Sequence, residues 1–362
     1  MARGDGNTTA AVPAACAGRD RGAVAAWRDA EERGPGSRAG ERPANVRAPM
    51  KLMAIILNWR TPDMTLQALD ALVPELRAIP TARGVIVDND SQDGSFEKLT
   101  EAVKARGLDD LVDVVQSGKN GGFGFGNNVG IRLGLQRGAE YCYVLNSDAF
   151  PDPGAVKRLV EYLDAHPQVG IAGSYIYGVD GVPHETAFRF PSLANEIDRG
   201  LKLGIVSRLL KDKIVPMPIP TTDTPVDWLA GASIMFRRQM LEQVGMFDET
   251  FFLYFEETDL CLRANRAGWP THYVRSSTVR HIGGATTGMK NKTKRMPTYI
   301  FESRRHYLLK NHGRRYLWAC DAAYVLASAT FQIRRRLQGK DDPDRPKELI
   351  DFLRFELTSR QP

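Results

Sequence analysis

Cysteine is scarce in this sequence, and its four cysteines stand far apart, at positions 16, 142, 261 and 320. No two form a Cys-x-x-Cys pair, so we expect neither a structural zinc site nor a disulfide framework, and the pattern fits a reducing cytosol. Long apolar runs are also missing, because no stretch reaches the roughly 18 uncharged apolar residues of a membrane-spanning helix. The apolar piece at 10–17 is short and contains Pro13, so it does not predict a signal peptide.

Large apolar residues are nearly absent from residues 1–49, which are rich in alanine, arginine, glycine and proline. Such a segment buries too little apolar surface to offset its chain entropy, so we expect a disordered N-terminal extension. The first predicted strand starts directly after Met50, which is therefore a candidate start of the translated chain.

Acidic residues are scarce over residues 276–340, which contain 14 lysines and arginines but only two acidic residues, Glu302 and Asp321. The whole chain of 362 residues carries a net charge of only +6, so this segment concentrates the positive charge. It predicts an anionic neighbour, such as a diphosphate or a membrane surface. A motif that reads nucleic acid is missing, and carboxylates elsewhere would repel phosphates, so we expect no nucleic-acid partner.

Apolar runs alternate with helical patterns from Leu52 onward. Strands are expected at 52–57, 84–87, 111–116 and 141–145. Helices are expected between them, from Pro62, at 95–106 and at 127–136. This order predicts an α/β fold with a mostly parallel central sheet. Further along we expect a loop or lid at 192–225, strands at 228–237 and 269–274, a loop and helix at 251–267, and helices at 299–311, 316–336 and 346–357.

Polar residues cluster where these strands end, at Asn58, Asp88, Asn120 and Asp148. Because ligands of open α/β sheets bind outside the carboxyl ends of the strands, we expect a nucleotide-type site over residues 52–148. Asp88 can accept a hydrogen bond from a base or ribose, although a capped turn before the next helix explains it equally well.

Three further motifs carry groups suited to a diphosphate or to a metal bound beside it. The segment 119–128 reads KNGGFGFGNN, and its glycines let the backbone approach an anion at the start of a helix. It matches neither the dinucleotide fingerprint nor a Walker A loop, so a flexible loop remains the alternative. Asp148 in the NSD motif can hold a divalent metal or simply end a strand, and His281 can be a metal ligand or structural.

The segment 251–263 reads FFLYFEETDLCLR and places Glu256 and Glu257 beside four aromatic residues. Burial there would raise a carboxyl pKa toward the range of a general base, whereas acids at a helix N-terminus are the alternative. In the expected helix, Asp259 and Arg263 form an i,i+4 ion pair on the face of Glu256. Glu257 points elsewhere, so we prefer Glu257 as the base.

The order of VDNDSQDGS, GGFGFGNN, NSD, DWLAGAS, FFLYFEETDLCLR and HIGG resembles bacterial glycosyltransferase family 2 over residues 52–310, most closely its rhamnosyltransferase-like branch. The stretch AFRFPS at 187–192 is also similar to that branch. The resemblance implies a GT-A fold, a nucleotide-diphosphate sugar donor, Mg²⁺ or Mn²⁺, and transfer with inversion. We therefore expect a catalytic domain at 50–298, with a nucleotide-binding half at 50–150 and an acceptor half at 151–298. The charge and helical pattern predict a basic amphipathic helical region at 299–362 after it.

The resemblance also implies a role for individual residues. Donor binding would fall to Asn58, Asp88, Asn120, Gly121, Gly122, Asn127, Asn146 and Asp148. The metal would contact Asp148 and His281, and the base would be Glu257 or Glu256. The sugar and acceptor pocket would be shaped by Arg189, Trp228, Gly231 and Ala232.

Two departures from the family pattern bear on activity. Asn146 stands where the family has a first acid, and Glu257 stands where it has aspartate. The longer side chain displaces the carboxylate by about one methylene, and a displacement of that order affects catalysis. These departures leave open an inactive nucleotide-sugar-binding or scaffold subunit as the alternative.

Residues 316–333 combine aromatic and aliphatic side chains between Arg314-Arg315 and Arg334-Arg335-Arg336. Basic clusters around an amphipathic helix suit an anionic membrane, so we expect a cytoplasmic enzyme, peripheral at the inner face of the plasma membrane. There it would meet lipid-linked acceptors of surface polysaccharide synthesis. A helix packed on the catalytic domain or a homodimer contact is the alternative. By resemblance, dTDP-rhamnose is the favoured donor.

Overall fold

The structure is a computed structural model, and it describes residues 50–283, 293–340 and 347–358. The extension expected at 1–49 lies outside the described residues, as do residues 341–346 and 359–362 of the expected C-terminal region. All described residues belong to one compact unit.

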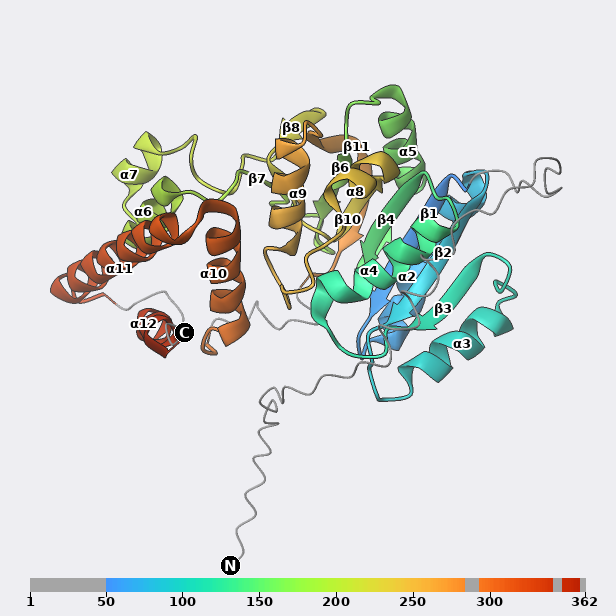
Figure 1. The fold of residues 1–362 in the computed structure, drawn as a ribbon, viewed down its shortest axis with the longest axis horizontal. Coiled ribbons are helices and arrows are strands. Elements are labelled where there is room, and N and C mark those ends of the chain that lie inside the picture. The colour runs from blue at the N-terminus through green and yellow to red at the C-terminus, as the bar shows by residue number, and fades with distance from the viewer. Residues whose placement is uncertain (1–49, 284–292, 341–346, 359–362) are drawn as a thin grey trace, which may run out of the picture. The chain divides into compact units, whose positions relative to one another are not determined.

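Nine strands of the described chain form one mixed sheet (Figure 1). They are β1 Leu52–Asn58, β2 Ala82–Asp88, β3 Val112–Gln116, β4 Tyr141–Asn146, β5 Ala149–Pro151, β6 Ile171–Tyr177, β8 Thr224–Val226, β10 Ser233–Arg237 and β11 Thr271–His281. Their order is β3-β2-β1-β4-β10-β6-β11-β5, with β8 paired to β11. The strands β3, β2, β1 and β4 run parallel, whereas β10 is antiparallel to both neighbours. The predicted α/β fold with a mostly parallel sheet is confirmed.

Helices pack on both faces of this sheet. They are α2 Pro62–Ala78, α3 Ser95–Ala105, α4 Gly122–Gln136, α5 Ala155–Ala165, α8 Arg238–Val244 and α9 Glu256–Arg266. Leu52, Ala54 and Ile56 of β1 share a core with α2, α3 and α5. Met53 and Ile55 point to the other face and share a core with α4, α8 and α9. The alternation of side chains along one strand therefore builds both cores.

Helix α4 approaches β1 closely because a row of its glycines leaves room for the strand's side chains. An added Cβ would meet side-chain atoms of β1 at 2.4 to 2.8 Å, for Gly126 against Leu57, Gly130 against Ile55, and Gly134 against Met53. A spacing of four residues places these glycines on one helical face. Close packing of that face on the sheet offsets the poor helix propensity of glycine.

Several elements differ from the sequence-based expectation. The helix predicted from Asn127 begins at Gly122, and β11 continues to His281 instead of ending at 274. The strand predicted at 228–237 is divided into β10 and β9 Trp228–Leu229, which pairs with β7 Ala187–Phe188 in a second, two-stranded sheet. The loop predicted at 192–225 contains α6 Leu193–Leu201, α7 Gly204–Leu209 and strand β8. Strands β5, β6 and β7 and helices α5 and α8 were not predicted.

The C-terminal helices α10 Thr298–His312, α11 Arg314–Leu337 and α12 Glu348–Thr358 confirm the predicted helical region. Two apolar clusters join them. One contains Phe251 and Leu262 together with Tyr307, Leu308, Leu317 and Cys320. The other contains Phe301, Tyr324, Leu349 and Phe352. Within the described part of the chain, every helix is too short or too polar to cross a membrane.

Candidate active site

A cavity of about 460 Å³ lies where the carboxyl ends of β1 and β4 meet the loop before α9. This is the position at which open α/β sheets bind their ligands, and the size suits a small-molecule substrate. Its walls are formed by Leu57, Trp59, Asn89, Asn120, Gly122, Phe123, Asn146, Ser147, Asp148, Ala230, Gly231, Ala232, Phe252, Leu253, Tyr254, Glu256, Glu257, His281 and Tyr299.

Much of the predicted site comes together in this cavity. The predicted residues that line it are Asn120, Gly122, Asn146, Asp148, Gly231, Ala232, Glu256, Glu257 and His281. The first and last of these residues, Asn120 and His281, are more than 150 residues apart in the sequence. The fold therefore brings together the glycine loop, the NSD motif, the glutamate pair and the histidine. The predicted residues that do not line it are Asn58, Asp88, Gly121, Asn127, Arg189 and Trp228.

Asn58 and Asp88 are buried and bond to each other instead of facing the cavity. Asn58 Nδ2 donates to Asp88 Oδ1 at 2.7 Å, and Asp88 also accepts from the backbone N–H and hydroxyl of Ser91. These bonds hold the ends of β1 and β2 together. The next residue after each, Trp59 and Asn89, lines the cavity. Both lie two residues after a predicted strand end, so the strand-end rule could have found them if it had been applied one residue further along.

The remaining predicted residues support the walls from outside. Asn127 Nδ2 donates to the carbonyl of Phe123 at 3.0 Å, so it holds the first turn of α4. Trp228 Nε1 donates to the carbonyl of Arg189 at 2.9 Å, and its ring stacks on Phe188. The ligand contacts expected for Asn58, Asp88, Gly121, Asn127, Arg189 and Trp228 stay predictions.

Asp148 and His281 meet because β5 pairs with the end of β11, where His281 is opposite Ala149. The Nε2 of His281 lies 3.0 Å from Oδ1 of Asp148, at the cavity wall. A carboxylate oxygen and an imidazole nitrogen are donors that Mn²⁺ accepts, and Mg²⁺ suits the carboxylate. Among the described residues no group of three or more His, Cys, Asp or Glu could hold a metal. The pair offers two donors, so a metal held here would need further ligands from water or substrate phosphates.

The two glutamates open α9 directly after a strained turn. Tyr254 and Phe255 have φ angles of 69° and 70°, a left-handed conformation that is costly for residues other than glycine. Glu257 Oε1 accepts a hydrogen bond from the backbone N–H of Gly231 at 3.1 Å. Glu256 is buried, and its Oε2 has no hydrogen-bond partner in the described structure.

Burial raises the pKa of both carboxyls, and the neighbouring Glu257 raises the pKa of Glu256 further. Two adjoining buried carboxyls resist ionising together. The hydrogen bond from Gly231 stabilises the charged form of Glu257, so Glu257 is the first of the two to lose its proton. Glu256 keeps its proton to higher pH.

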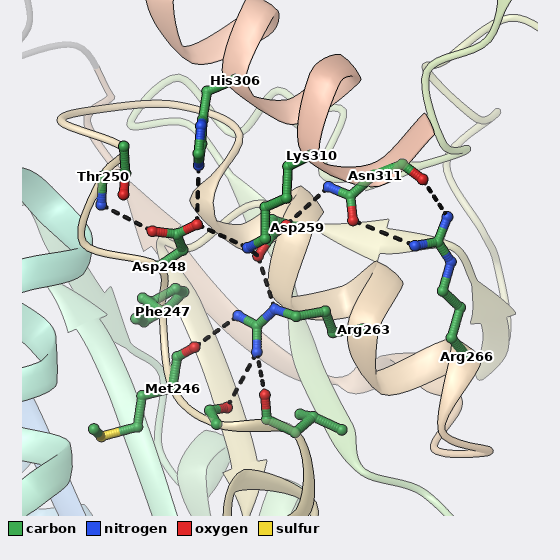
Figure 2. A network of polar contacts seen from close by, with 12 residues as sticks. Met246, Phe247, Asp248, Thr250, Asp259, Arg263, Arg266, His306, Lys310 and Asn311 are labelled. Carbon is green, nitrogen blue, oxygen red and sulfur yellow. Dashed lines mark hydrogen bonds and ion pairs between the residues drawn. The ribbon is translucent and has the colours of Figure 1, made fainter. Parts of the chain in front are cut away.

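The predicted ion pair on α9 is confirmed. Arg263 Nε donates to Asp259 Oδ2 at 2.8 Å (Figure 2). The same guanidinium donates to the carbonyl of Met246 at 2.6 Å, so it also ties α9 to the segment that follows α8. The pair therefore stabilises the helix on which both glutamates stand.

Gly231→Ala is expected to reduce turnover far more than stability. A Cβ at this position would lie 2.6 Å from Glu257 Oε1 and 3.0 Å from the ring of Phe123, so the carboxylate must move and the ring must yield slightly. Because the carboxylate ends a flexible side chain, we expect a stability loss of about 1 kcal/mol or less, but a loss of turnover of roughly 10- to 100-fold. Thermal unfolding and steady-state assays measure the two effects. Gly204→Ala is the control, since its Cβ would have no atom within 4 Å. Unchanged turnover in Gly231→Ala would contradict this expectation.

An α/β sheet with a cavity at the carboxyl ends of its strands is the arrangement in which enzymes with open α/β sheets bind nucleotides and other small ligands. Comparison with known proteins identifies the family. The family model described as "Glycosyltransferase like family 2" matches residues 49–299, and the chain belongs to this family. The protein is therefore a glycosyltransferase, as the motif order predicted.

Relatives within the family include rhamnosyltransferases. The N-acetylglucosaminyl-diphospho-decaprenol L-rhamnosyltransferase of Mycobacterium tuberculosis is 28% identical over 243 residues, which cover 61% of this chain and 75% of the relative. The dTDP-rhamnosyl transferase RfbF of Shigella flexneri is 26% identical over 233 residues, covering 64% and 69%.

A solved structure of similar fold is the mannosyltransferase PcManGT from Pyrobaculum calidifontis, in complex with GDP-Man and Mn²⁺. It has a TM-score of 0.52 at 15% identity and covers 93% of this chain and 87% of its own. At this identity the likeness concerns the fold alone, and it supports the predicted GT-A class.

Proposed function

We propose that the protein transfers rhamnose from dTDP-rhamnose to a hydroxyl of a lipid-linked glycan, with inversion, in the synthesis of a bacterial surface polysaccharide. One relative is named for a diphospho-decaprenol acceptor and another for dTDP-rhamnosyl transfer, which supports this choice of substrates. The observation that carries the proposal is the shared cavity, in which Glu257 lies together with the Asp148 and His281 pair.

In the proposed reaction, Glu257 accepts the proton of the acceptor hydroxyl as its oxygen attacks the anomeric carbon. The new bond to the sugar forms while the bond between sugar and diphosphate breaks, so dTDP leaves and the configuration inverts. The backbone N–H of Gly231 holds the Glu257 carboxylate, and protonated Glu256 avoids a second buried charge beside it.

The nucleotide side of the site would bind and orient the donor. Asp148 and His281 would hold Mg²⁺ or Mn²⁺, which when bound neutralises charge on the diphosphate. Asn120 and Gly122 line the same cavity and would contact the nucleotide sugar. Phe123 and Phe252 also line it, and their rings reduce the space open to water, which would compete with the acceptor.

A transfer assay tests this function. The purified protein is given dTDP-L-rhamnose, a short-chain N-acetylglucosaminyl-diphospho-lipid and Mn²⁺. We expect a rhamnosylated lipid whose anomeric configuration, read by NMR, is inverted from the donor. We expect EDTA to stop the reaction and added Mn²⁺ or Mg²⁺ to restore it. Donor binding without transfer would contradict the proposal and favour a binding or scaffold subunit, whereas transfer from another nucleotide hexose would correct the donor.

We also propose that α11 contacts an anionic membrane surface. This helix exposes Trp318, Leu326, Ile333 and Leu337, which recur at helical spacing. Arginines lie at both of its ends, at 314–315 and 334–336. An exposed apolar face between basic clusters is the pattern of helices that lie in the membrane interface. Such contact would hold a cytoplasmic enzyme at the inner face of the plasma membrane, beside its lipid-linked acceptor.

Vesicle sedimentation tests the membrane contact. We expect the protein to sediment with phosphatidylglycerol vesicles and not with phosphatidylcholine vesicles, because the arginines require an anionic surface. The double substitution Leu326→Gln and Ile333→Gln should reduce binding at least about tenfold, since it removes two exposed apolar side chains. Val179→Gln, at an exposed valine between β6 and β7, is the control. A concentration-dependent homodimer without vesicle binding would contradict the proposal.

A further inference from the structure

One lysine of α10 contacts the chain on both sides of the loop that leads into the glutamates. Lys310 Nζ lies 2.7 Å from Asp248 Oδ2 and 2.8 Å from Asp259 Oδ2 (Figure 2). Asp248 precedes this loop, and Asp259 lies three residues after Glu256. Lys310 therefore connects the two ends of residues 249–258, which include both glutamates and part of the cavity wall.

The end of this connection on α9 is fully buried. The side chain of Asp259 has 0% exposure, and besides Lys310 it accepts from Arg263 Nε at 2.8 Å and Asn311 Nδ2 at 2.9 Å. Removing one partner from a buried ionic group leaves charge that the surroundings do not compensate. The start of α9 would then have to shift to bring Asp259 toward water.

The other end is also held by several groups. Asp248 accepts from His306 Nε2 at 3.0 Å and from the backbone N–H of Thr250 at 2.9 Å. Burial pushes the pKa of Asp248 upward, but the bonds from His306 and Lys310 outweigh it and hold that pKa well below its usual value. Asp248 is therefore ionised at neutral pH, and its carboxylate can pair there with the Lys310 ammonium.

Helix α10 touches the loop between these two ends as well. Ser303 Oγ donates to the carbonyl of Leu253 at 3.0 Å, and the Phe251 ring lies 4.7 Å from the ring of His306. The left-handed Tyr254 and Phe255 lie in the same loop. Strained backbone of this kind persists only where surrounding contacts fix it, and α10 supplies such contacts.

We propose that Lys310 is a positioning residue of the transferase, which fixes residues 249–258 so that the Glu257 carboxylate faces the acceptor hydroxyl. It acts through Asp248 and Asp259 and is not itself in the cavity wall. The inference rests on the proposed role of Glu257. Tyr299 at the start of α10 already lines the cavity, and the proposal adds a supporting role for a later residue of this helix, beyond the residues 49–299 that match the family.

Lys310→Met tests this role, because methionine keeps an unbranched apolar chain and removes the charge. We expect kcat for rhamnose transfer to fall roughly 10- to 100-fold, while KM for dTDP-rhamnose stays within about twofold. Amide hydrogen exchange over residues 249–255 should accelerate by about tenfold or more, because the loop opens locally.

Lys51→Met is the matched control. Lys51 also joins two acidic groups, Glu140 at 2.9 Å and Asp164 at 2.7 Å, and its side chain is 26% exposed against 30% for Lys310. These groups are not in the cavity wall, so this variant should lose stability without changing kcat or exchange in the loop.

Unchanged loop exchange in Lys310→Met, or a loss of kcat no greater than in Lys51→Met, would overturn the proposal. Should Lys310→Met fail to fold, Asp248→Asn removes the charge from one end of the connection, and it must change kcat and exchange in the same directions. Should the wild-type protein transfer no sugar, the proposed function is wrong. The positioning role then falls with it, and loop exchange, which requires no substrate, still decides whether Lys310 fixes residues 249–258.

Discussion

Glu257→Gln is expected to lower kcat by about 10²- to 10⁴-fold, the range that general base catalysis contributes. Glutamine has nearly the same shape, and its carbonyl oxygen can still accept the hydrogen bond from Gly231, but it cannot take a proton from the acceptor. Binding of dTDP-rhamnose should therefore stay within about twofold of wild type. Steady-state transfer assays and donor-dependent thermal shifts measure the two quantities.

Glu256→Gln is the matched comparison, because Glu256 already carries a proton where Glu257 has lost one. We expect it to keep most of the activity. Burial raises the pKa of Glu257 above the ordinary value of 4.5, so the wild-type rate should fall as pH drops through that raised pKa. An inactive Glu256→Gln beside an active Glu257→Gln would reverse the assignment.

The same pKa shifts predict how the free energy of unfolding depends on pH. The folded-state pKa values of both glutamates lie above their unfolded values. The stabilising contribution of these two carboxyl groups to the free energy of unfolding is therefore complete below the unfolded pKa. It is lost as pH rises through the folded pKa. At pH 7 the substitution Glu256→Gln removes a titrating group from the buried pair. We expect it to be at least as stable as wild type in urea denaturation.

Gly122→Ala is expected to destabilise the protein by about 3 kcal/mol or more and to inactivate it. Gly122 has a φ of +89°, and an added Cβ would lie 1.9 Å from the carbonyl oxygen of Phe252. That oxygen accepts the N–H of Phe123 at 2.9 Å, so the glycine loop and the loop before α9 are in direct contact. A backbone clash cannot be relieved by a rotamer change, and the cavity wall at Phe252 must move.

Gly138→Ala is the control for Gly122→Ala, because it separates the cost of a left-handed backbone from the cost of the clash with Phe252. Gly138 also has a positive φ, +79°, but its Cβ would meet nothing within 4 Å. It therefore carries the cost of the left-handed backbone, about 1 kcal/mol, without the clash. Urea denaturation gives both free energies of unfolding. Equal losses in the two variants would show that the contact with Phe252 carries no energy.

The strand ends were predictable because a buried parallel strand is a continuous apolar run, and its first polar residue marks the carboxyl edge. The side of the strand end was harder to predict. Asn58 and Asp88 point into the protein, whereas Trp59 and Asn89, one position further, line the cavity. Successive side chains of a strand point to opposite faces, so an error of one residue exchanges a buried bond for a ligand contact.

The contribution of α10 was not predictable from local pattern. Tyr299 lines the cavity and Lys310 pairs with Asp259, yet both lie beyond the expected catalytic boundary at 298. Neither belongs to a motif with a recognised chemistry, and their partners are 40 or more residues earlier in the chain. Only the folded chain brings these groups together. The division of the chain at 298 stays a prediction, although the contacts of α10 run across it.

The separation between Asp259 and its partners has a consequence for the order of folding during synthesis. Lys310 and Asn311 follow Asp259 by 51 and 52 residues. The ribosome adds about 5–20 residues each second, so the buried carboxylate waits several seconds for its full set of partners. During that interval the central sheet can assemble, but the loop with the glutamates lacks the helix that fixes it. The active site is therefore among the last parts of the nascent enzyme to reach its final form.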